Sequence, residues 1–278
     1  MKLCISALAW NIENKNNVYD FLSKKEIKFI EVVPFKISNL GLYDEYNNYI
    51  RLKKEWEDFG LKAVSMQSLH FGLNNCSLFN SEIERKNLYE YTLKSIEIAS
   101  TLGIEHIVFG SPKLRIIPDN MSYDKANDIA LEFFTKLNDD AIKYNVVIGL
   151  EPNSKEYGTN FLTNTKDTFD FVKKIDLKNI KINLDLSTII LENENIAQSI
   201  DLVNSLNYSF HCHISIPYLK NNYADYKNNL IEYFSKLKTS KVNHCSIETV
   251  INNNSEIENI NIINEIIDFI ESIEKETI

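Results

Sequence analysis

Short apolar segments alternate with longer amphipathic segments along the whole chain. The short segments are rich in Ile, Val, Leu and Phe, and this alternation is typical of parallel β-strands covered by helices. We predict strands over Leu3–Ala9, Lys28–Val33, Leu61–Gln67, Ile104–Phe109, Val146–Glu151, Ile180–Asp185, Tyr208–Ile214 and Val242–Thr249. Eight such units in 278 residues predict an α/β fold, a (β/α)₈ barrel that forms a single domain over residues 1–278.

Helical periodicity fills the segments between the predicted strands. One helix should end at Leu102, where Gly103 is a suitable C-cap, and others should cover Tyr123–Tyr144 and Ile257–Ile273. Ser81 followed by Glu84 resembles a capping box and indicates a helix start. An open doubly wound sheet also alternates strands and helices, but no GxGxxG motif follows the first predicted strand, so the barrel is the better prediction.

Charge and cysteine content limit the classes of partner. The formal net charge is −9, and the sequence has no run of Lys and Arg that could follow the backbone of a nucleic-acid duplex. We therefore expect no nucleic-acid partner. No segment approaches the ~18 apolar residues of a membrane span, and the N-terminal residues lack an apolar stretch long enough for a signal peptide, so we expect neither. The cysteines, Cys4, Cys76, Cys212 and Cys245, lack CxxC spacing and are predicted to be reduced core residues, which favours the cytoplasm.

Four consecutive predicted strands end in side chains that can bind a metal. These side chains are Glu151, Asp185, His213 and Glu248. The C-terminal ends of barrel strands meet at one mouth, so these side chains should converge. Each carboxylate taken alone could be a helix N-cap or a solvated loop residue. Because buried carboxylates are costly without a partner, four such ends in a row favour a divalent cation over coincidence.

The choice between the two histidines of the seventh strand follows from their depth. Alternation places His211 and His213 on the same face, and His213 lies nearer the C-terminal end. We therefore predict His213 as a ligand and His211 as a supporting or core residue. Three carboxylates and one imidazole form an oxygen-rich set that suits Mn²⁺ best, with Mg²⁺, Co²⁺ or Zn²⁺ as alternatives.

These residues resemble the xylose isomerase-like barrel superfamily, and in particular its sugar phosphate isomerase/epimerase group, which includes ketose 3-epimerases and apurinic endonucleases. The resemblance spans nearly the whole chain. It depends on Glu151 before Pro152-Asn153, on Asp185, on the His-x-His of His211 and His213, and on Glu248. It implies that Glu151 and Glu248 are metal-bound and act as the acid/base pair of a proton transfer through an enediolate.

The chain departs from the pattern of the families that it resembles, and the Arg that ketose 3-epimerases have a few residues after the seventh-strand histidine is absent after His213. Many members have a histidine three residues after the Asp, where this chain has Thr188, which removes a ligand of a second metal or of the substrate. The endonucleases need further histidines at the third and fourth strand ends, and only His70 is available here. The resemblance therefore favours an isomerase or epimerase acting on a small sugar or sugar phosphate over an apurinic endonuclease.

Further residues are candidates for substrate binding, each with a simpler alternative. Lys113 and Arg115 could hold a phosphate or carboxylate, or could be solvated loop charges. Trp10 could stack on a sugar or plug the barrel. Glu31 interrupts an apolar strand, so it should point inward and pair with His70 or a substrate hydroxyl. The remaining candidates are Asn153, for which a surface loop position is the favoured interpretation, and His211.

Two other functions stay open at this point. A dehydratase of a polyol or hydroxy acid would begin with the same proton abstraction, and a non-catalytic sugar-binding barrel would share the fold. The chain could act as a homo-oligomer, and the sequence does not determine the number of subunits or the sugar.

Overall fold

Eight parallel strands form a closed barrel in the computed structural model of the protein, in the order β1 to β8 with β8 paired to β1. The structure describes residues 2–36, 46–251 and 255–277. The strands are β1 Lys2–Ser6, β2 Phe29–Val32, β3 Lys62–Met66, β4 His106–Phe109, β5 Val147–Leu150, β6 Ile180–Asp185, β7 Phe210–Ser215 and β8 Val242–Glu248. The predicted barrel is confirmed, and the open doubly wound sheet is excluded because the sheet has no edge strand.

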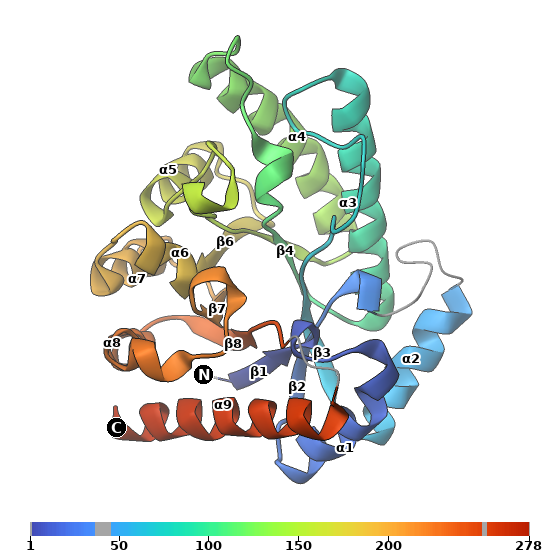
Figure 1. The fold of residues 1–278 in the computed structure, drawn as a ribbon. Helices are drawn as coiled ribbons and strands as arrows, with labels where there is room; N and C mark the ends of the chain where they lie inside the picture. The colour runs from blue at the N-terminus through green and yellow to red at the C-terminus, as the bar shows by residue number, and fades with distance from the viewer. Residues whose placement is uncertain (1, 37–45, 252–254, 278) are drawn as a thin grey trace.

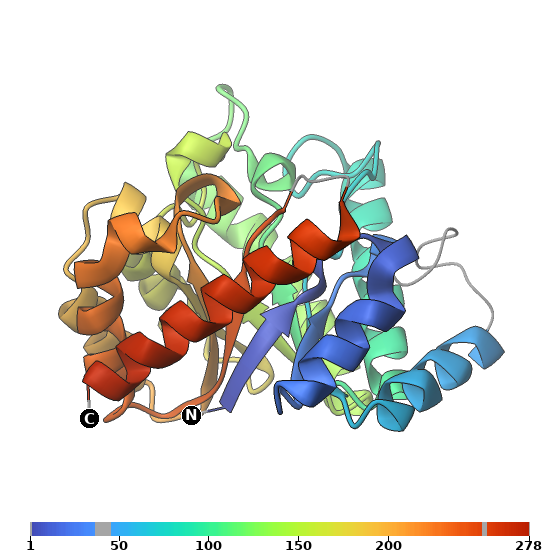
Figure 2. The same ribbon diagram turned by 60° about the horizontal axis from the view of Figure 1, so that its bottom comes forward.

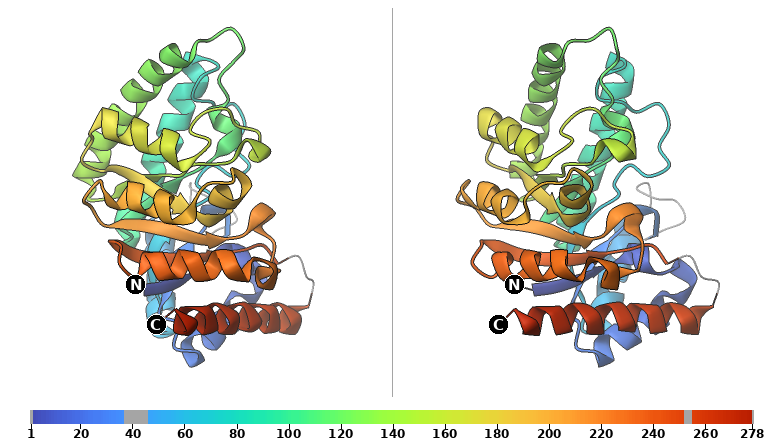
Figure 3. Two further views of the ribbon diagram at one scale, coloured as in Figure 1. Left: turned by 90° about the vertical axis from the view of Figure 1, so that its left-hand side faces the viewer. Right: turned by 60° about the vertical axis from the view of Figure 1, so that its left-hand side comes forward.

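Helices surround this barrel (Figure 1). They are α1 Lys15–Lys24, α2 Tyr46–Asp58, α3 Glu82–Leu102, α4 Tyr123–Lys143, α5 Thr165–Ile175, α6 Leu186–Leu191, α7 Ile196–Asn204, α8 Lys227–Leu237 and α9 Glu256–Glu276. Helix α9 runs alongside α8 and completes the outer layer (Figures 2 and 3). No helix within the described ranges is both long and apolar enough for a bilayer crossing.

The predicted helix ends are set by the residues that the sequence indicated. The Ser81 hydroxyl oxygen accepts a hydrogen bond of 3.2 Å from the Glu84 backbone N–H and thereby caps α3. At the other end, Gly103 adopts a left-handed conformation with φ of 75°, which a glycine tolerates without steric cost. The predicted helices over Tyr123–Tyr144 and Ile257–Ile273 correspond to α4 and α9.

The first strand is shorter than predicted. We expected it to reach Ala9, but β1 ends at Ser6 and Ala7–Ala9 form a 3₁₀ turn. The Ser6 hydroxyl accepts the Leu8 N–H at 3.3 Å, which is a local bond that competes with continuation of the strand. The turn carries Trp10 into the core, where it is 3% exposed.

Polar side chains occupy many inward positions of the barrel, which is unusual because branched apolar residues commonly fill this space. Glu31, Asn183 and His211 are all buried there. The outward positions of the same strands, such as Cys212 and Ile247, are apolar and pack beneath the helices. The four cysteines are buried and free, as predicted. The helices are thus held by an ordinary apolar layer, while the inside of the barrel is available for polar chemistry.

Candidate metal centre

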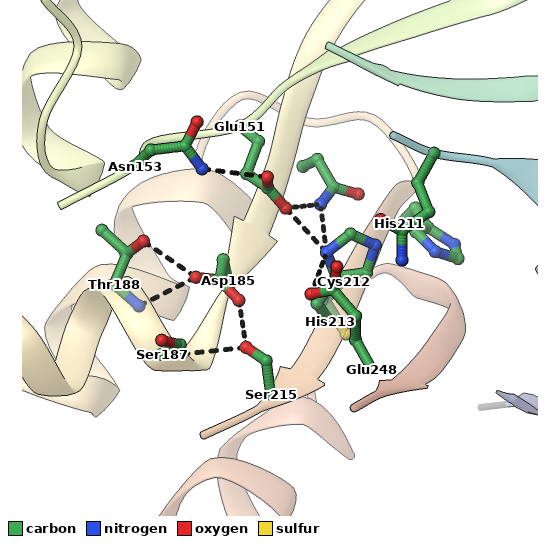
Figure 4. Close-up of polar contacts among 12 residues, drawn as sticks. Glu151, Asn153, Asp185, Ser187, Thr188, His211, Cys212, His213, Ser215 and Glu248 are labelled. Carbon is green, nitrogen blue, oxygen red and sulfur yellow. Dashed lines mark hydrogen bonds and ion pairs between the residues drawn. The ribbon is translucent and has the colours of Figure 1, made fainter. Parts of the chain in front are cut away.

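Glu151, Asp185, His213 and Glu248 converge at the C-terminal mouth of the barrel. One ligand atom from each lies within 4.8 Å of the others, and all four residues are buried. His213 Nδ1 is 2.6 Å from Glu151 Oε1 and 3.3 Å from Glu248 Oε2. Figure 4 shows their side chains pointing toward one another. We refer to these four residues as the carboxylate–histidine cluster.

The register of the strands explains this convergence. Asp185 of β6 pairs directly with His213 of β7, and Ser215 of β7 pairs with Glu248 of β8. Glu151 follows directly after the last residue of β5, so its side chain joins the same layer. Because side chains alternate along a strand, these residues all face the barrel axis at one height.

Hydrogen bonds hold two of the carboxylates in place. Asn153 Nδ2 donates to Glu151 Oε2 at 3.0 Å, and Asn183 Nδ2 donates to Glu151 Oε1 at 2.9 Å. Thr188 donates its backbone N–H to Asp185 Oδ2 at 2.8 Å, and the Ser215 hydroxyl donates to Asp185 Oδ1. The bond from Thr188 to Asp185 Oδ2 caps helix α6, so the N-cap alternative and membership of the cluster are both true of this residue.

The proximity of these acids changes their protonation. Burial raises the pKa of Glu248 to about 8, and the charges of Glu151 and Asp185 add to this effect against the opposing effect of His213. Burial and Glu151 raise the pKa of Asp185 to about 6. Burial alone would lower the pKa of His213, but the charges of Glu31, Glu248 and Glu151 raise it well above its usual value. Protons therefore offset part of the negative charge when no cation is bound.

The donor set fits a divalent cation. Three carboxylates and one imidazole nitrogen lie at mutual distances that a single ion can span, and hard cations prefer such oxygen-rich sets. A cation would replace the protons that the raised pKa values indicate, since metal ligands bind in their deprotonated forms.

Glu31 and His211 lie in the layer of the barrel directly below the cluster. Glu31 is completely buried, and its Oε2 lies 3.2 Å from His213 Nε2 and 3.1 Å from His211 Nε2. Ser65 and Gln67 also donate to Glu31, at 2.7 and 3.1 Å. Burial would raise the pKa of Glu31, but the two histidines hold it well below its usual value. The inward orientation predicted for Glu31 is correct, and its partners are these histidines rather than His70.

Arg115 is completely buried beside the cluster. Its Nη2 donates to the Glu151 backbone oxygen at 3.0 Å and to Asn153 Oδ1 at 2.6 Å. Burial lowers the pKa of Arg115 to about 10. Arg115 thus orients the Asn153 amide so that its N–H group faces Glu151, and Asn153 is a buried residue rather than a surface loop residue.

The remaining predicted substrate-binding residues lie apart from this network. His70 Nδ1 contacts Ser111 Oγ at 2.8 Å and its Nε2 contacts Thr92 Oγ1 at 2.9 Å, so both ring nitrogens have protein partners. Burial lowers the pKa of His70 to about 3. Lys113 is exposed in the 3₁₀ turn Pro112–Arg115. Trp10 packs edge-on against Tyr19 in the core, with ring centroids 6.2 Å apart.

Asn183 and Ser215 were not identified from the sequence as residues of the site. The signal for both was present in the alternation of the strands, because Asn183 precedes Asp185 by two residues and Ser215 follows His213 by two. Each therefore shares the inward face with a cluster residue. Alternation predicts the face of a residue, but it does not predict which neighbour the side chain will bind.

A family model described as xylose isomerase-like TIM barrel matches residues 20–273. The chain belongs to this family. No curated protein sequence matches it. Three solved structures that resemble this chain share at most 15% of their residues with it and therefore support the fold alone.

These three structures cover almost the entire chain. The apo form of 3-keto-D-glucoside 4-epimerase from E. coli has a TM-score of 0.74 at 15% identity, with 96% of this chain and 99% of that chain covered. D-allulose 3-epimerase from Methylomonas sp., in complex with D-allulose, has a TM-score of 0.72 at 13% identity, with 98% and 96% covered. The IolI protein, with a bound zinc atom, has a TM-score of 0.69 at 14% identity, with 98% and 99% covered.

Proposed function

We propose that this protein is a divalent-metal-dependent isomerase or epimerase that acts on a small sugar or sugar phosphate. The observation that carries the proposal is the carboxylate–histidine cluster, in which two glutamates lie beside one histidine nitrogen at the barrel mouth. Family membership and the sugar epimerases among the similar structures support the same class of reaction.

Glu151 and Glu248 are the acid/base pair in this proposal. They come from different sides of the cluster, Glu151 from the end of β5 and Glu248 from the end of β8. One glutamate would remove a carbon-bound proton next to a carbonyl, and the other would return a proton to the opposite face. Return to the same carbon gives epimerisation, and return to the adjacent carbon gives isomerisation. The pKa of Glu248, raised to about 8 without a cation, would fall when a cation binds, so the ionised carboxylate would then be available to accept a proton from the substrate.

Glu151, Asp185, His213 and Glu248 would hold the cation. When bound, a divalent cation would supply Lewis-acid stabilisation of the negative charge that develops on substrate oxygens. Mn²⁺ or Mg²⁺ suits three carboxylates best, and the zinc bound by the IolI protein keeps Zn²⁺ as an alternative. The buried free cysteines are compatible with a reducing compartment, and we propose a cytoplasmic location on this basis.

The test is hydrogen exchange between substrate and solvent. Metal-loaded protein is incubated in deuterated water with a panel of aldoses, ketoses and their phosphates, and deuterium incorporation is measured by mass spectrometry and NMR. We expect incorporation at one carbon with the metal present, and none with Glu151→Gln or Glu248→Gln. Circular dichroism confirms that both variants are folded. Exchange at the original rate in both variants would remove the two glutamates from the mechanism.

The same mass measurement separates the main alternative. A dehydratase would release a product lighter by one water molecule, whereas an epimerase or isomerase leaves the substrate mass unchanged apart from deuterium. A non-catalytic sugar-binding barrel would show neither exchange nor mass loss.

A further inference from the structure

A second polar cavity lies at the opposite end of the barrel from the carboxylate–histidine cluster. It has a volume of about 210 Å³ and is lined by residues near the beginnings of the strands. Lys62 and His106 are the first residues of β3 and β4, and Lys181 is the second residue of β6. His211 and His244 also line it. We call this space the N-terminal cavity.

The lysines of the N-terminal cavity lack acidic partners. Neither Lys62 nor Lys181 forms an ion pair with a residue in the described ranges, although the chain has nine more acidic than basic side chains. Lys181 instead places its Nζ over the ring of Tyr208, at 5.1 Å from the centroid. Glu105 is the single acidic residue among the cavity's lining residues. The cavity therefore has a surplus of positive charge within an acidic protein.

The histidines add hydrogen-bonding groups to this positive environment. The rings of His106 and His211 lie 4.9 Å apart, and those of His211 and His244 lie 6.5 Å apart. Burial, with His211, Lys2 and Lys62, lowers the pKa of His244 to about 4. Burial also lowers the pKa of His106 well below its usual value. The rings of His106 and His244 are neutral at neutral pH, so each carries one N–H donor and one acceptor, whereas the N–H of His211 is donated to Glu31.

We propose that the N-terminal cavity binds a small oxyanion of the phosphate class. Lysine ammonium groups are effective partners for phosphate oxygens, and imidazole N–H groups can complete the contacts. A metal ion is the less suitable ligand, because the lysines repel a cation. Both clusters of ligand atoms close enough to hold an ion within the described residues contain His213, which does not line the cavity, and His211 is their one member that does.

A small anion fits better than a polyanion. The two lysines line one small cavity, with Lys62 exposed and Lys181 half-buried, and the net charge of −9 repels an extended polyphosphate chain. Free phosphate and a phosphate ester share the chemistry that this cavity recognises. The proposal does not depend on the proposed function, because the cavity contains none of the four cluster residues.

The test is a calorimetric titration of inorganic phosphate into chelator-treated protein at neutral pH in a low-salt buffer. Removal of metal ensures that phosphate cannot bind through a cation at the other mouth. Glycerol phosphate is titrated in parallel. Binding of inorganic phosphate alone would indicate a site for the free ion, and binding of both would show that the cavity also accepts an ester, so either result supports the proposal.

Three variants locate the binding. Lys62→Met and Lys181→Met should each weaken phosphate binding about tenfold, since each removes a charged donor. Lys174→Met is the matched control, because Lys174 is an exposed lysine in the last turn of α5 outside the cavity, and it should leave the affinity unchanged.

Glu105→Gln gives a change in the opposite direction. It removes the single acidic side chain lining the cavity and should strengthen phosphate binding several-fold, which general loss of stability cannot produce. The proposal is wrong if phosphate shows no binding up to about 10 mM. It is equally wrong if the Lys62, Lys181 and Lys174 variants all bind phosphate with the affinity of the original protein.

Discussion

Glu31 contacts His213 from below, with Glu31 Oε2 at 3.2 Å from His213 Nε2. An ionised carboxylate can only accept a hydrogen bond, so Nε2 of His213 carries a proton and donates it. The other nitrogen, Nδ1, faces Glu151 and Glu248. A buried carboxylate in the middle of the barrel thus selects which histidine nitrogen is available to a cation, and partners of this kind are known to tune metal affinity.

Replacement of Glu31 should therefore weaken metal binding. In Glu31→Gln, the amide can donate to His213 Nε2 and favour the tautomer in which Nδ1 is protonated. We expect the affinity for Mn²⁺ to fall by about 10–100-fold, measured by competition with a fluorescent chelator. Ser65→Ala removes one hydrogen bond to Glu31 but keeps its charge, so its effect should be smaller. Equal affinities in Glu31→Gln and the original protein would contradict this role.

Asp185 combines two roles that substitutions can separate. Its side chain caps α6 and also belongs to the carboxylate–histidine cluster. Asn is as good an N-cap as Asp, so Asp185→Asn should keep the helix start and lose most of the metal affinity. Asp185→Ala should lose both and cost a further ~1 kcal/mol in the free energy of unfolding. Urea denaturation and metal titration measure the two effects. Retention of full metal affinity in Asp185→Asn would exclude Asp185 as a ligand.

Arg115 should contribute to stability through its contacts with Glu151 and Asn153. Arg115→Met leaves the Glu151 backbone oxygen and Asn153 Oδ1 without this donor. We expect a loss of about 1–3 kcal/mol in the free energy of unfolding, measured with urea. Arg51→Met is the control, since Arg51 is exposed, and should change stability by less than about 0.5 kcal/mol. Equal stability of the two variants would show that the buried contacts contribute nothing.

The stability of metal-free protein should fall as pH rises from about 6.5 to about 8. The pKa of Glu248 is raised from 4.5 to about 8, so the folded state binds a proton that the unfolded state has already released in this range. The slope is at most about 1.4 kcal/mol per pH unit for one proton. Below pH 6.5, His70 and His244 act in the opposite sense, since the pKa of His70 is lowered from 6.5 to about 3 and that of His244 to about 4.

Thermal unfolding of chelator-treated protein across this pH range checks the prediction. Glu248→Gln cannot titrate and should have a flatter profile than the original protein. Addition of Mn²⁺ should raise the unfolding temperature most at the upper end of the range, where fewer protons compete for the ligands. A profile that is the same in both proteins would mean that Glu248 titrates at its ordinary value.

Local sequence patterns were sufficient to predict the architecture and to select the four residues of the carboxylate–histidine cluster. Alternation along the strands and the number of strand–helix units predicted the barrel, and Gly103 and Ser81 predicted helix ends correctly. These signals are local, because periodicity and capping depend on a few neighbouring residues. The error at β1 arose where a single side chain, that of Ser6, formed a competing turn.

The partners of the buried polar residues were decided by the tertiary structure alone. The sequence by itself determined that Glu31, Asp185 and His213 face the barrel axis, because inward orientation follows from position in a strand. It did not determine that Glu31 would bind His213 rather than His70, or that Arg115 would be buried against Glu151. Those contacts join residues that are far apart in the chain, and their distances depend on the stagger of strands around the closed barrel, which no local segment encodes.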